Sequence, residues 1–254
     1  MSRLTIFNCK GGVGKTTTTM NLSAAVSRSG RQVTLLDFDP QCHLTRIINA
    51  QPKDYRQSVY AHFVHATPLK EMMVEWPGIG WLLPAHVQLM KVDSLFGKGP
   101  RALGMLCNGL DQLDQSGQRT TLIDCCPYVG LLSLNAIFAS DAVLIPVAAD
   151  YLSFLGAKQI ARTLAALEPV LKKRLTRRYV LTRVDRRRKL GGIIYKQMSE
   201  LFGVEVCQTI IGENTTIAES PIHGQDVFSF KNNSDGARDY QELFHELVQA
   251  GLIT

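Results

Sequence analysis

Short apolar runs alternate along the chain with longer stretches that carry both apolar and polar side chains. The short runs are rich in Val, Ile and Leu and lack strict alternation with polar residues, which is typical of strands buried on both faces of a sheet. This pattern predicts seven strands, at Leu4–Asn8, Val33–Asp37, Gly80–Leu83, Thr121–Asp124, Ala142–Val147, Tyr179–Thr182 and Val206–Ile210.

The longer stretches between these runs have the apolar spacing of amphipathic helices. They predict helices at Thr16–Ser29, Arg101–Leu113, Leu155–Leu171, Gly192–Phe202 and Ala237–Gln249. Strands that alternate with helices are joined by right-handed crossovers. The expected fold class is therefore α/β, with a mostly parallel twisted sheet and helices on both faces. The segment Asn49–Gly78 is the least regular, and we expect short helices and loops there.

A glycine-rich string follows the first predicted strand and opens the first predicted helix. It reads Cys9-Lys10-Gly11-Gly12-Val13-Gly14-Lys15-Thr16-Thr17. This is the context that a phosphate-binding loop requires. Glycines let the backbone fold closely around phosphates, and the exposed amides and the helix N-terminus attract the anion. The string predicts a site for ATP and Mg²⁺, in which Lys15 contacts the β- and γ-phosphates and the Thr16 hydroxyl ligates the metal.

Acidic side chains end two of the apolar runs. Asp37 ends the second predicted strand and Asp39 follows it, and Asp124 ends a later strand. A magnesium–nucleotide site needs carboxylates at the ends of neighbouring strands. Asp39 and Asp124 are therefore candidate metal-site residues, and Asp37 is a candidate supporting acid.

The phosphate loop resembles the deviant Walker A motif of the ParA/MinD superfamily, because Lys10 opens the glycine run and Cys9 stands where the usual first glycine would be. The acidic segments resemble the DxDPQ and LIDCPP motifs of that family. Other stretches resemble its LLTLNA, VLTxxD and SEAPxxG motifs. The resemblance is closest to the small ParA/Soj partition or positioning ATPases and covers nearly the whole chain except about residues 49–76.

The resemblance implies a P-loop NTPase fold and a role for each matched residue. Lys10 would reach across a nucleotide-sandwich dimer to the partner's phosphates, and Asp150 would face that dimer interface. Asp39 would position or activate the attacking water, and Asp124 would hold magnesium through a water. The implied catalytic residues are Lys10, Lys15 and Asp39; the implied metal-site residues are Thr16, Asp39 and Asp124. The implied ATP-binding residues are Lys10, Gly11, Gly12, Val13, Gly14, Lys15, Thr16, Thr17, Thr182 and Pro221.

Basic residues are concentrated in one window of a chain whose net charge is +6. Residues 172–189 include ten Lys or Arg and a single acid, Asp185, so the window carries +9 and the rest of the chain −3. We expect one positive patch on a slightly acidic body. Concentrated Lys and Arg bind phosphate backbones through counterion release, without reading sequence. The expected DNA-binding residues are Lys172, Lys173, Arg177, Arg178, Arg186, Arg187, Arg188 and Lys189.

Two other functions stay open at this level, a membrane-cycling ATPase of the MinD kind and a metabolic P-loop kinase or ligase. The stretch from Glu242 to Thr254 contains two acids and no Lys or Arg, so it would be a poor interfacial anchor, and we expect no stable membrane binding. No motif marks a second-substrate pocket. The six cysteines form no CxxC pair, and the adjacent Cys125 and Cys126 are expected to pack as small apolar side chains.

The sequence thus predicts one ATPase domain over residues 1–254, without a separate N-terminal DNA-binding domain. The predicted enzyme is an ATP hydrolase with low intrinsic turnover. ATP and Mg²⁺ would assemble a homodimer that binds non-specific DNA, and hydrolysis would release it. The implied partner is a ParB-like or cargo-adaptor protein, and the cargo a plasmid, a chromosome or a protein assembly. The expected location is the cytoplasm, in association with the nucleoid.

Overall fold

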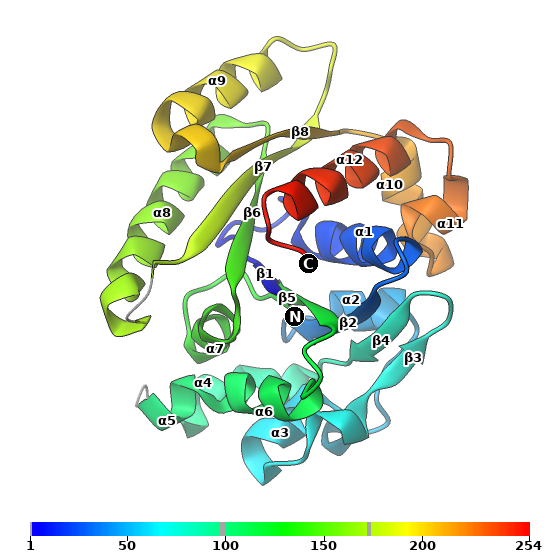
Figure 1. Cartoon of the computed structure of the whole chain (residues 1–254), viewed down its shortest axis with the longest axis vertical. Helices are drawn as coiled ribbons and strands as arrows, with labels where there is room; N and C mark the ends of the chain where they lie inside the picture. Colours follow the sequence, from blue (N-terminus) through cyan, green and yellow to red (C-terminus); the bar gives the residue numbers. More distant parts are fainter. Residues whose placement is uncertain (1, 97–99, 172–173) are drawn as a thin grey trace.

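The computed structural model describes residues 2–96, 100–171 and 174–254, and its framework is an eight-stranded sheet (Figure 1). The strands lie in the order β3-β4-β2-β5-β1-β6-β7-β8, and neighbouring strands are parallel except for β3 and β4. They span Ser2–Ile6 (β1), Gln32–Phe38 (β2), Val74–Trp76 (β3), Gly80–Leu83 (β4), Arg119–Cys125 (β5), Ala142–Ala148 (β6), Thr176–Val184 (β7) and Val206–Gly212 (β8). The expected α/β class with a mostly parallel sheet is confirmed.

Helices cover both faces of the sheet (Figure 1). One face carries α1 (Lys15–Arg28), α11 (Val227–Lys231) and α12 (Asp235–Gln249), and the other carries α7 (Leu131–Ala139), α8 (Tyr151–Leu171) and α9 (Leu190–Phe202). The shorter helices are α2 (His43–Ile47), α3 (Val59–His65), α4 (Val92–Leu95), α5 (Pro100–Leu103), α6 (Met105–Leu113) and α10 (Thr215–Glu219). This layering places a separate hydrophobic core on each side of the sheet.

Consecutive residues of one strand enter different cores. Leu35 of β2 and Leu122 of β5 pack under α1 and α12, whereas Leu36 and Ile123 pack toward α7. All four side chains are fully buried. Since side chains alternate between the faces of a strand, a sheet covered on both sides needs apolar residues at every position. This requirement explains why the strands read as continuous apolar runs.

The central strand, β1, lies between β5 and β6. The chain leaves β1 toward β2 on one side, whereas it leaves β5 toward β6 on the other. Ligands of such sheets bind beyond the carboxyl ends of the strands where the direction reverses. Ile6 of β1 and Asp37 of β2 both pair in register with Asp124 of β5, so the loops that follow these strands share that edge.

Several elements differ from the sequence expectation, among them the short helices α2, α4, α10 and α11, which were not predicted. Strand β3 lies within the segment where we expected only short helices and loops, because a three-residue edge strand carries too short a pattern to detect. Helix α7 was missed because its residues are apolar on almost every side, which hides the helical period. The helix expected at Arg101–Leu113 is divided into α5 and α6 at Gly104. Among the described residues, no helix is both long and apolar enough to cross a membrane.

Candidate functional site: a nucleotide pocket beside the phosphate loop

The glycine-rich string forms the loop between β1 and α1. Gly12 and Gly14 have φ angles of 74° and 89°, in the left-handed region that glycine adopts without steric cost. Helix α1 begins at Lys15, directly after the loop, and no acidic residue lies in its first turn. The positive end of the helix dipole and the Lys15 ammonium therefore act together on an anion placed at the loop.

Lys15 is held at the floor of this loop. Its side chain is largely buried, with the residue 8% exposed, and its Nζ donates to the carbonyl oxygen of Lys10 at 3.1 Å. The loop borders a pocket of about 550 Å³, a size typical of a site for a small organic ligand. The pocket is lined by Gly11, Gly12, Gly14, Lys15, Thr16, Thr17, Asp39, Gln41, His43, Pro127, Thr182, Arg183, Ile211, Gly212, Glu213, Asn214, Ile217, Ala218 and Tyr240.

Asp124 lies where a magnesium ion would be needed. Its Oδ2 accepts a hydrogen bond from the Thr16 hydroxyl at 2.7 Å, while its Oδ1 is buried and has no hydrogen-bond partner. Burial, reinforced by the nearby Asp37 carboxylate, raises the pKa of Asp124 well above its usual value. An unpartnered carboxylate oxygen beside a threonine hydroxyl fits a magnesium ion held through water. Thr16 and Asp124 would hold this ion, which supplies positive charge against the phosphates.

The described residues include no group of three or more His, Cys, Asp or Glu side chains arranged to hold a metal ion. Magnesium at this site would therefore take its remaining ligands from nucleotide phosphates and water, as Mg²⁺ commonly does. Thr16 and Asp124 thus lie together beside the phosphate loop and Asp39 lines the same pocket, and their role as metal-site residues stays a prediction.

Asp37 and Asp39 have different positions although they are two residues apart. Asp37 is fully buried, and its Oδ2 accepts from the backbone N–H and the hydroxyl of Thr45 at 2.8 and 2.6 Å. Burial raises the pKa of Asp37 to about 6. Asp39 lines the pocket, and its Oδ1 accepts from the backbone N–H of Gln41 at 2.9 Å. Asp37 thus holds Thr45 in place, and Asp39 is the one of these two carboxylates that lines the pocket.

Lys10 points away from the pocket, toward the start of α8. Its Nζ donates to Asp150 Oδ1 at 2.8 Å and to the Ser153 hydroxyl at 2.9 Å. Burial opposes ionisation of Asp150, but the hydrogen bonds from Lys10 and Ser153 hold its pKa below the usual value. In the single chain, the two residues expected at a dimer interface are therefore paired with each other. Their side chains are 36% and 44% exposed, so the pair is open to exchange of partners.

The loop after β5 combines buried thiols with an exposed tip. Cys125 and Cys126 are fully buried within the core under α7, as expected for packing residues, and burial raises the pKa of the Cys125 thiol. Tyr128 and Val129 at the tip are exposed. The loop ends where the backbone N–H of Leu131, at the start of α7, donates to the Asp93 carboxylate of α4. Sequence reasoning missed this contact because Asp93 and Leu131 lie in segments that carry no shared motif.

Asp93→Ala is expected to destabilise the protein by about 1 kcal/mol, because α7 would lose the carboxylate that caps its first turn. For a chain of this size, that loss lowers the melting temperature by about 2–4 °C. Thermal melts of the nucleotide-free protein measure it. Asp93→Asn is the matched control and should stay close to wild type, because asparagine keeps an acceptor oxygen. Equal melting temperatures for Asp93→Ala and wild type would show that the contact contributes nothing to stability.

The opposite end of the pocket is built by β7, β8 and α10. Thr182 lies in this wall as expected, and its hydroxyl donates to the carbonyl oxygen of Val13 at 2.9 Å. Pro221 does not belong to the described lining of the pocket. It follows α10, whose residues Ile217 and Ala218 form the wall in its place. The segment from Ala218 to Gly224 thus begins at this wall, and a nucleotide contact of Pro221 stays a prediction.

The expected single basic patch is wrong, because the structure separates its residues along β7. Lys172 and Lys173 lie outside the described residues. Arg174, Arg177 and Arg178 lie at the amino end of β7, and Arg186, Arg187, Arg188 and Lys189 follow its carboxyl end. A nine-residue strand is about 26–30 Å long, so these are two clusters and not one surface. We call them the amino-end cluster and the carboxyl-end cluster.

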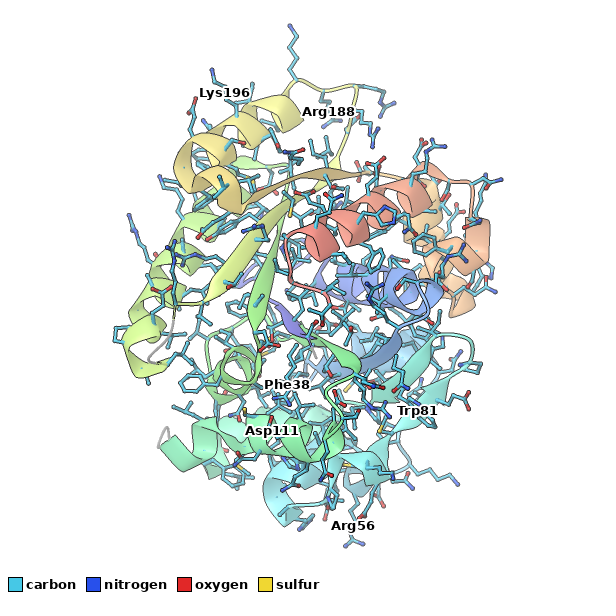
Figure 2. The ribbon with its side chains drawn as sticks, viewed as in Figure 1. Phe38, Arg56, Trp81, Asp111, Arg188 and Lys196 are labelled. Atoms are coloured by element: carbon cyan, nitrogen blue, oxygen red, sulfur yellow. The ribbon has the colours of Figure 1, made fainter. Side chains whose placement is uncertain are left out.

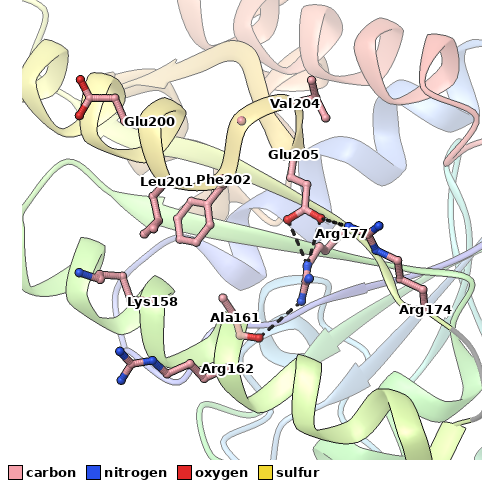
Figure 3. Close-up of a pocket in the computed structure, with 11 residues that line it drawn as sticks. Lys158, Ala161, Arg162, Arg174, Arg177, Glu200, Leu201, Phe202, Val204 and Glu205 are labelled. Carbon is pink, nitrogen blue, oxygen red and sulfur yellow. Dashed lines mark hydrogen bonds and ion pairs between the residues drawn. The ribbon is translucent and has the colours of Figure 1, made fainter.

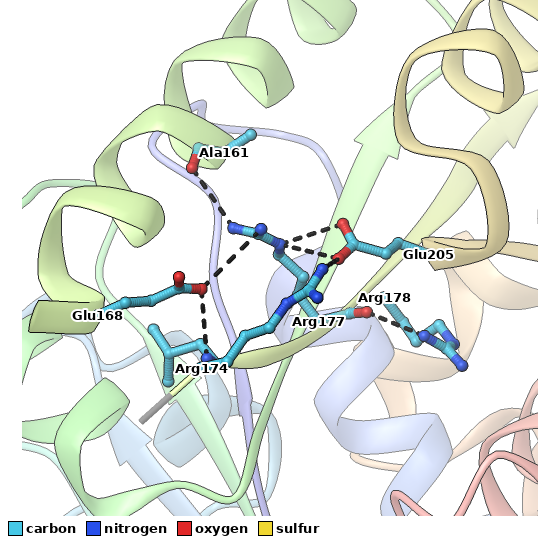
Figure 4. Close-up of polar contacts among 7 residues, drawn as sticks. Ala161, Glu168, Arg174, Arg177, Arg178 and Glu205 are labelled. Atoms are coloured by element: carbon cyan, nitrogen blue, oxygen red, sulfur yellow. Dashed lines mark hydrogen bonds and ion pairs between the residues drawn. The ribbon is translucent and has the colours of Figure 1, made fainter. Parts of the chain in front are cut away.

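The amino-end cluster is largely occupied by internal ion pairs. The Arg177 side chain is 13% exposed, and its Nε donates to both carboxylate oxygens of Glu205, at 3.1 and 3.2 Å (Figures 3 and 4). Arg174 lies 3.5 Å from the same carboxylate. Arg178 points to the other side of the strand (Figure 4). Arg177 is thus a structural side chain here, which sequence could not show because Glu205 is remote along the chain.

A groove of about 670 Å³ opens beside Arg177, between α8 and the end of α9 (Figure 3). Lys158, Arg162 and Arg174 bring positive charge to it, and Glu200 and Glu205 bring negative charge. The groove is remote from the phosphate loop, and its mixed charges give no strong preference for an anion.

The carboxyl-end cluster is more exposed. The side chains of Arg187 and Arg188 are 90% and 77% exposed, and both pair with Asp185, at 2.9 and 3.2 Å. Arg186 pairs with the nearly buried Asp239 of α12 at 2.6 Å. Arg188 and Lys196 project from the same end of the molecule (Figure 2). Asp239 partly offsets the positive charge of this cluster, but the guanidinium groups of Arg187 and Arg188 remain accessible to a phosphate backbone.

Comparisons with known proteins agree with this geometry. A family described as an AAA domain matches residues 1–177. The chain is 32% identical to the chromosome partitioning protein ParA of Caulobacter vibrioides over 96% of this chain and 93% of that protein. It is also 32% identical to the sporulation initiation inhibitor protein Soj of Bacillus subtilis over 98% of each.

A solved structure described as cobyrinic acid a,c-diamide synthase of Mycobacterium smegmatis, with bound ADP and magnesium, superposes with a TM-score of 0.85. It is 26% identical and covers 99% of this chain and 96% of that one. The sheet order, the phosphate loop with its two lysines and the full-length relatives all lead to one assignment. The chain belongs to the ParA/MinD family of P-loop ATPases, which bind ATP with magnesium.

Proposed function

We propose that this chain is a positioning ATPase whose ATP-bound homodimer binds non-specific DNA through the carboxyl-end cluster. The main support for the proposal is that the nucleotide pocket and a second pocket at the carboxyl-end cluster have three wall residues in common. Gly212, Glu213 and Asn214 line the nucleotide pocket and also line a second pocket that includes Arg186 and Arg187. A change in this wall on nucleotide binding would therefore act directly on the cluster.

Dimer formation would convert weak DNA binding into firm binding. Each phosphate that a protein neutralises adds about 0.9 to the slope of log affinity against log salt. Two copies of the carboxyl-end cluster on one duplex double the number of contacts, and binding of the second copy becomes intramolecular. Hydrolysis would separate the copies and release the DNA. ATP turnover in this scheme is slow until a partner protein stimulates it.

The pairing of Lys10 with Asp150 indicates how the dimer would form. In the single chain this ion pair is exposed, and exposed pairs contribute at most about 1 kcal/mol. A partner's phosphates, concentrated in a dry interface, would attract the Lys10 ammonium more strongly. Lys10 would then move from Asp150 to the partner's nucleotide, so we place both residues at the proposed dimer interface.

Lys10→Ala tests the proposal. The variant is expected to bind ATP within about threefold of wild type, because Lys10 lies outside the lining of the pocket. It should stay monomeric with ATP in light-scattering measurements, and its DNA affinity should fall to the nucleotide-free value. Asp150→Ala is the control, because it breaks the same ion pair but keeps the lysine. A Lys10→Ala monomer that binds DNA as tightly as the wild type would contradict dimer-gated binding.

The relatives named above suggest the cellular setting. One of them is the chromosome partitioning protein ParA, and we propose the same class of work for this chain, with a ParB-like or cargo-adaptor partner and a location in the cytoplasm at the nucleoid. We also propose that residues 1–254 act as one ATPase domain. A MinD-like membrane cycle is less well supported, because α12 buries Leu243, Phe244 and Leu247 against α1 and the sheet and so has no free apolar face.

A further inference from the structure

The carboxyl end of β7 carries an irregularity beside the phosphate loop. Leu181 pairs with Ile210 of β8, and Val184 pairs with Gly212, so β7 advances by three residues while β8 advances by two. The extra residue makes a β-bulge, a feature that redirects side chains and is frequent next to active sites. Arg183 lies in this bulge with a φ of +55°, in the left-handed region that a side chain with a Cβ rarely adopts.

The bulge directs two consecutive side chains to the same target. In a regular strand, neighbouring side chains point to opposite faces. Here the Thr182 hydroxyl donates to the carbonyl oxygen of Val13 at 2.9 Å, and Arg183 Nη1 donates to the carbonyl oxygen of Gly12 at 3.1 Å. Two adjacent residues of β7 therefore hold two adjacent carbonyl groups of the phosphate loop.

The orientation of these carbonyls fixes the amides that would meet a nucleotide. In a planar trans peptide the C=O and the following N–H point in opposite directions. When the carbonyls of Gly12 and Val13 are drawn toward β7, the N–H groups of Val13 and Gly14 point away from it. Backbone N–H groups of such a loop are the donors that surround the phosphates.

We propose that Arg183 is a positioning residue for the phosphate loop and thereby sets nucleotide affinity. Its guanidinium links the loop to β8, because Nη2 also lies 3.5 Å from the Glu213 carboxylate, within the wall of the nucleotide pocket. The left-handed backbone of Arg183 is unfavourable for a non-glycine residue. Its contacts with Gly12 and Glu213 oppose that cost. Thr182 alone would leave the glycine-rich part of the loop, at Gly12, without a side-chain restraint from β7.

Arg183→Ala and Arg183→Gly separate this role from a general effect on stability. Both remove the guanidinium, so both are expected to weaken ATP and ADP binding to a similar extent, about 3–10-fold, as loss of one charge-assisted hydrogen bond at a half-exposed site predicts. The glycine variant relieves the left-handed strain, so without nucleotide it should melt about 2–4 °C above the alanine variant. Calorimetric titration with each nucleotide, without DNA, and thermal melts give the two readouts.

Two further variants complete the test. Arg183→Lys keeps the charge but donates to one acceptor at a time, so it should recover only part of the affinity. Lys196→Ala removes an exposed cation of α9 that lies outside the lining of the pocket and pairs with Glu200, so it should stay within about twofold of wild type. Arg183→Ala and Arg183→Gly affinities within twofold of wild type would overturn the proposal. So would affinities that follow the melting temperatures, or full recovery by Arg183→Lys.

Discussion

Lys15→Ala is expected to lower the affinity for ATP by at least about 100-fold, the largest effect of any single change considered for this chain. Lys15 is nearly buried at the base of the phosphate loop and brings the one ammonium that lines the described pocket. Each charge-assisted hydrogen bond is worth about 1.5–3 kcal/mol, and a lysine between two phosphates makes more than one. A factor of 100 corresponds to about 2.7 kcal/mol.

Isothermal titration with ATP and with ADP in the presence of Mg²⁺ measures this loss. Lys196→Ala is the matched control, because Lys196 is an exposed lysine on α9 that pairs only with Glu200, at 3.9 Å, among the described contacts. It should bind nucleotide like the wild type. An ATP affinity for Lys15→Ala within tenfold of wild type would contradict the assignment of Lys15 to the phosphates.

Arg187→Glu is expected to weaken DNA binding of the ATP-bound protein by about 10–100-fold at 0.1 M salt, because it reverses two positive charges in each dimer at the proposed contact surface. ATP affinity and dimer formation should not change, since the 90% exposed Arg187 side chain lies outside the nucleotide lining. Fluorescence anisotropy with a random-sequence duplex measures the DNA affinity, and the slope of affinity against salt should fall with it.

Arg174→Glu is the matched control for Arg187→Glu, because it makes the same change of charge at the other cluster. Arg174 is also exposed, at 78%, and lies near a carboxylate, but it belongs to the amino-end cluster. Its DNA affinity should stay within about threefold of wild type. Equal losses for both variants would mean that the DNA surface extends along β7, and a loss for Arg174→Glu alone would move the surface to the amino end.

The parts of the site that the sequence predicted are those carried by a contiguous motif. Lys15, Thr16 and the loop glycines follow β1 directly, and their geometry depends on neighbouring residues. The acids were also predictable, because Asp37 and Asp124 lie one residue before the ends of adjacent parallel strands and pair in register. The apolar runs located β1, β2 and β5 to β8 with bounds that differ by at most three residues, and β4 was predicted residue for residue.

The parts that the sequence did not predict depend on residues that are distant along the chain. Arg177 forms an ion pair with Glu205, and Arg186 forms one with Asp239. The positive charge available on residues 172–189 therefore could not be counted from the sequence of that segment alone. The contact of Asp93 with the start of α7 and the bulge at Arg183 likewise arise from packing between elements. Pro221 follows α10, whose Ile217 and Ala218 line the pocket, and its contact with a nucleotide stays a prediction.

Control of DNA binding by ATP can be measured as the affinity for random-sequence duplex DNA with ATP, with ADP and without nucleotide. Each state should be measured at two salt concentrations. We expect firm binding with ATP alone, with a salt slope about twice that of the weak binding in the other two states. Equal affinity and equal slopes in all three states would contradict it, and would leave an ATPase whose nucleotide does not control DNA.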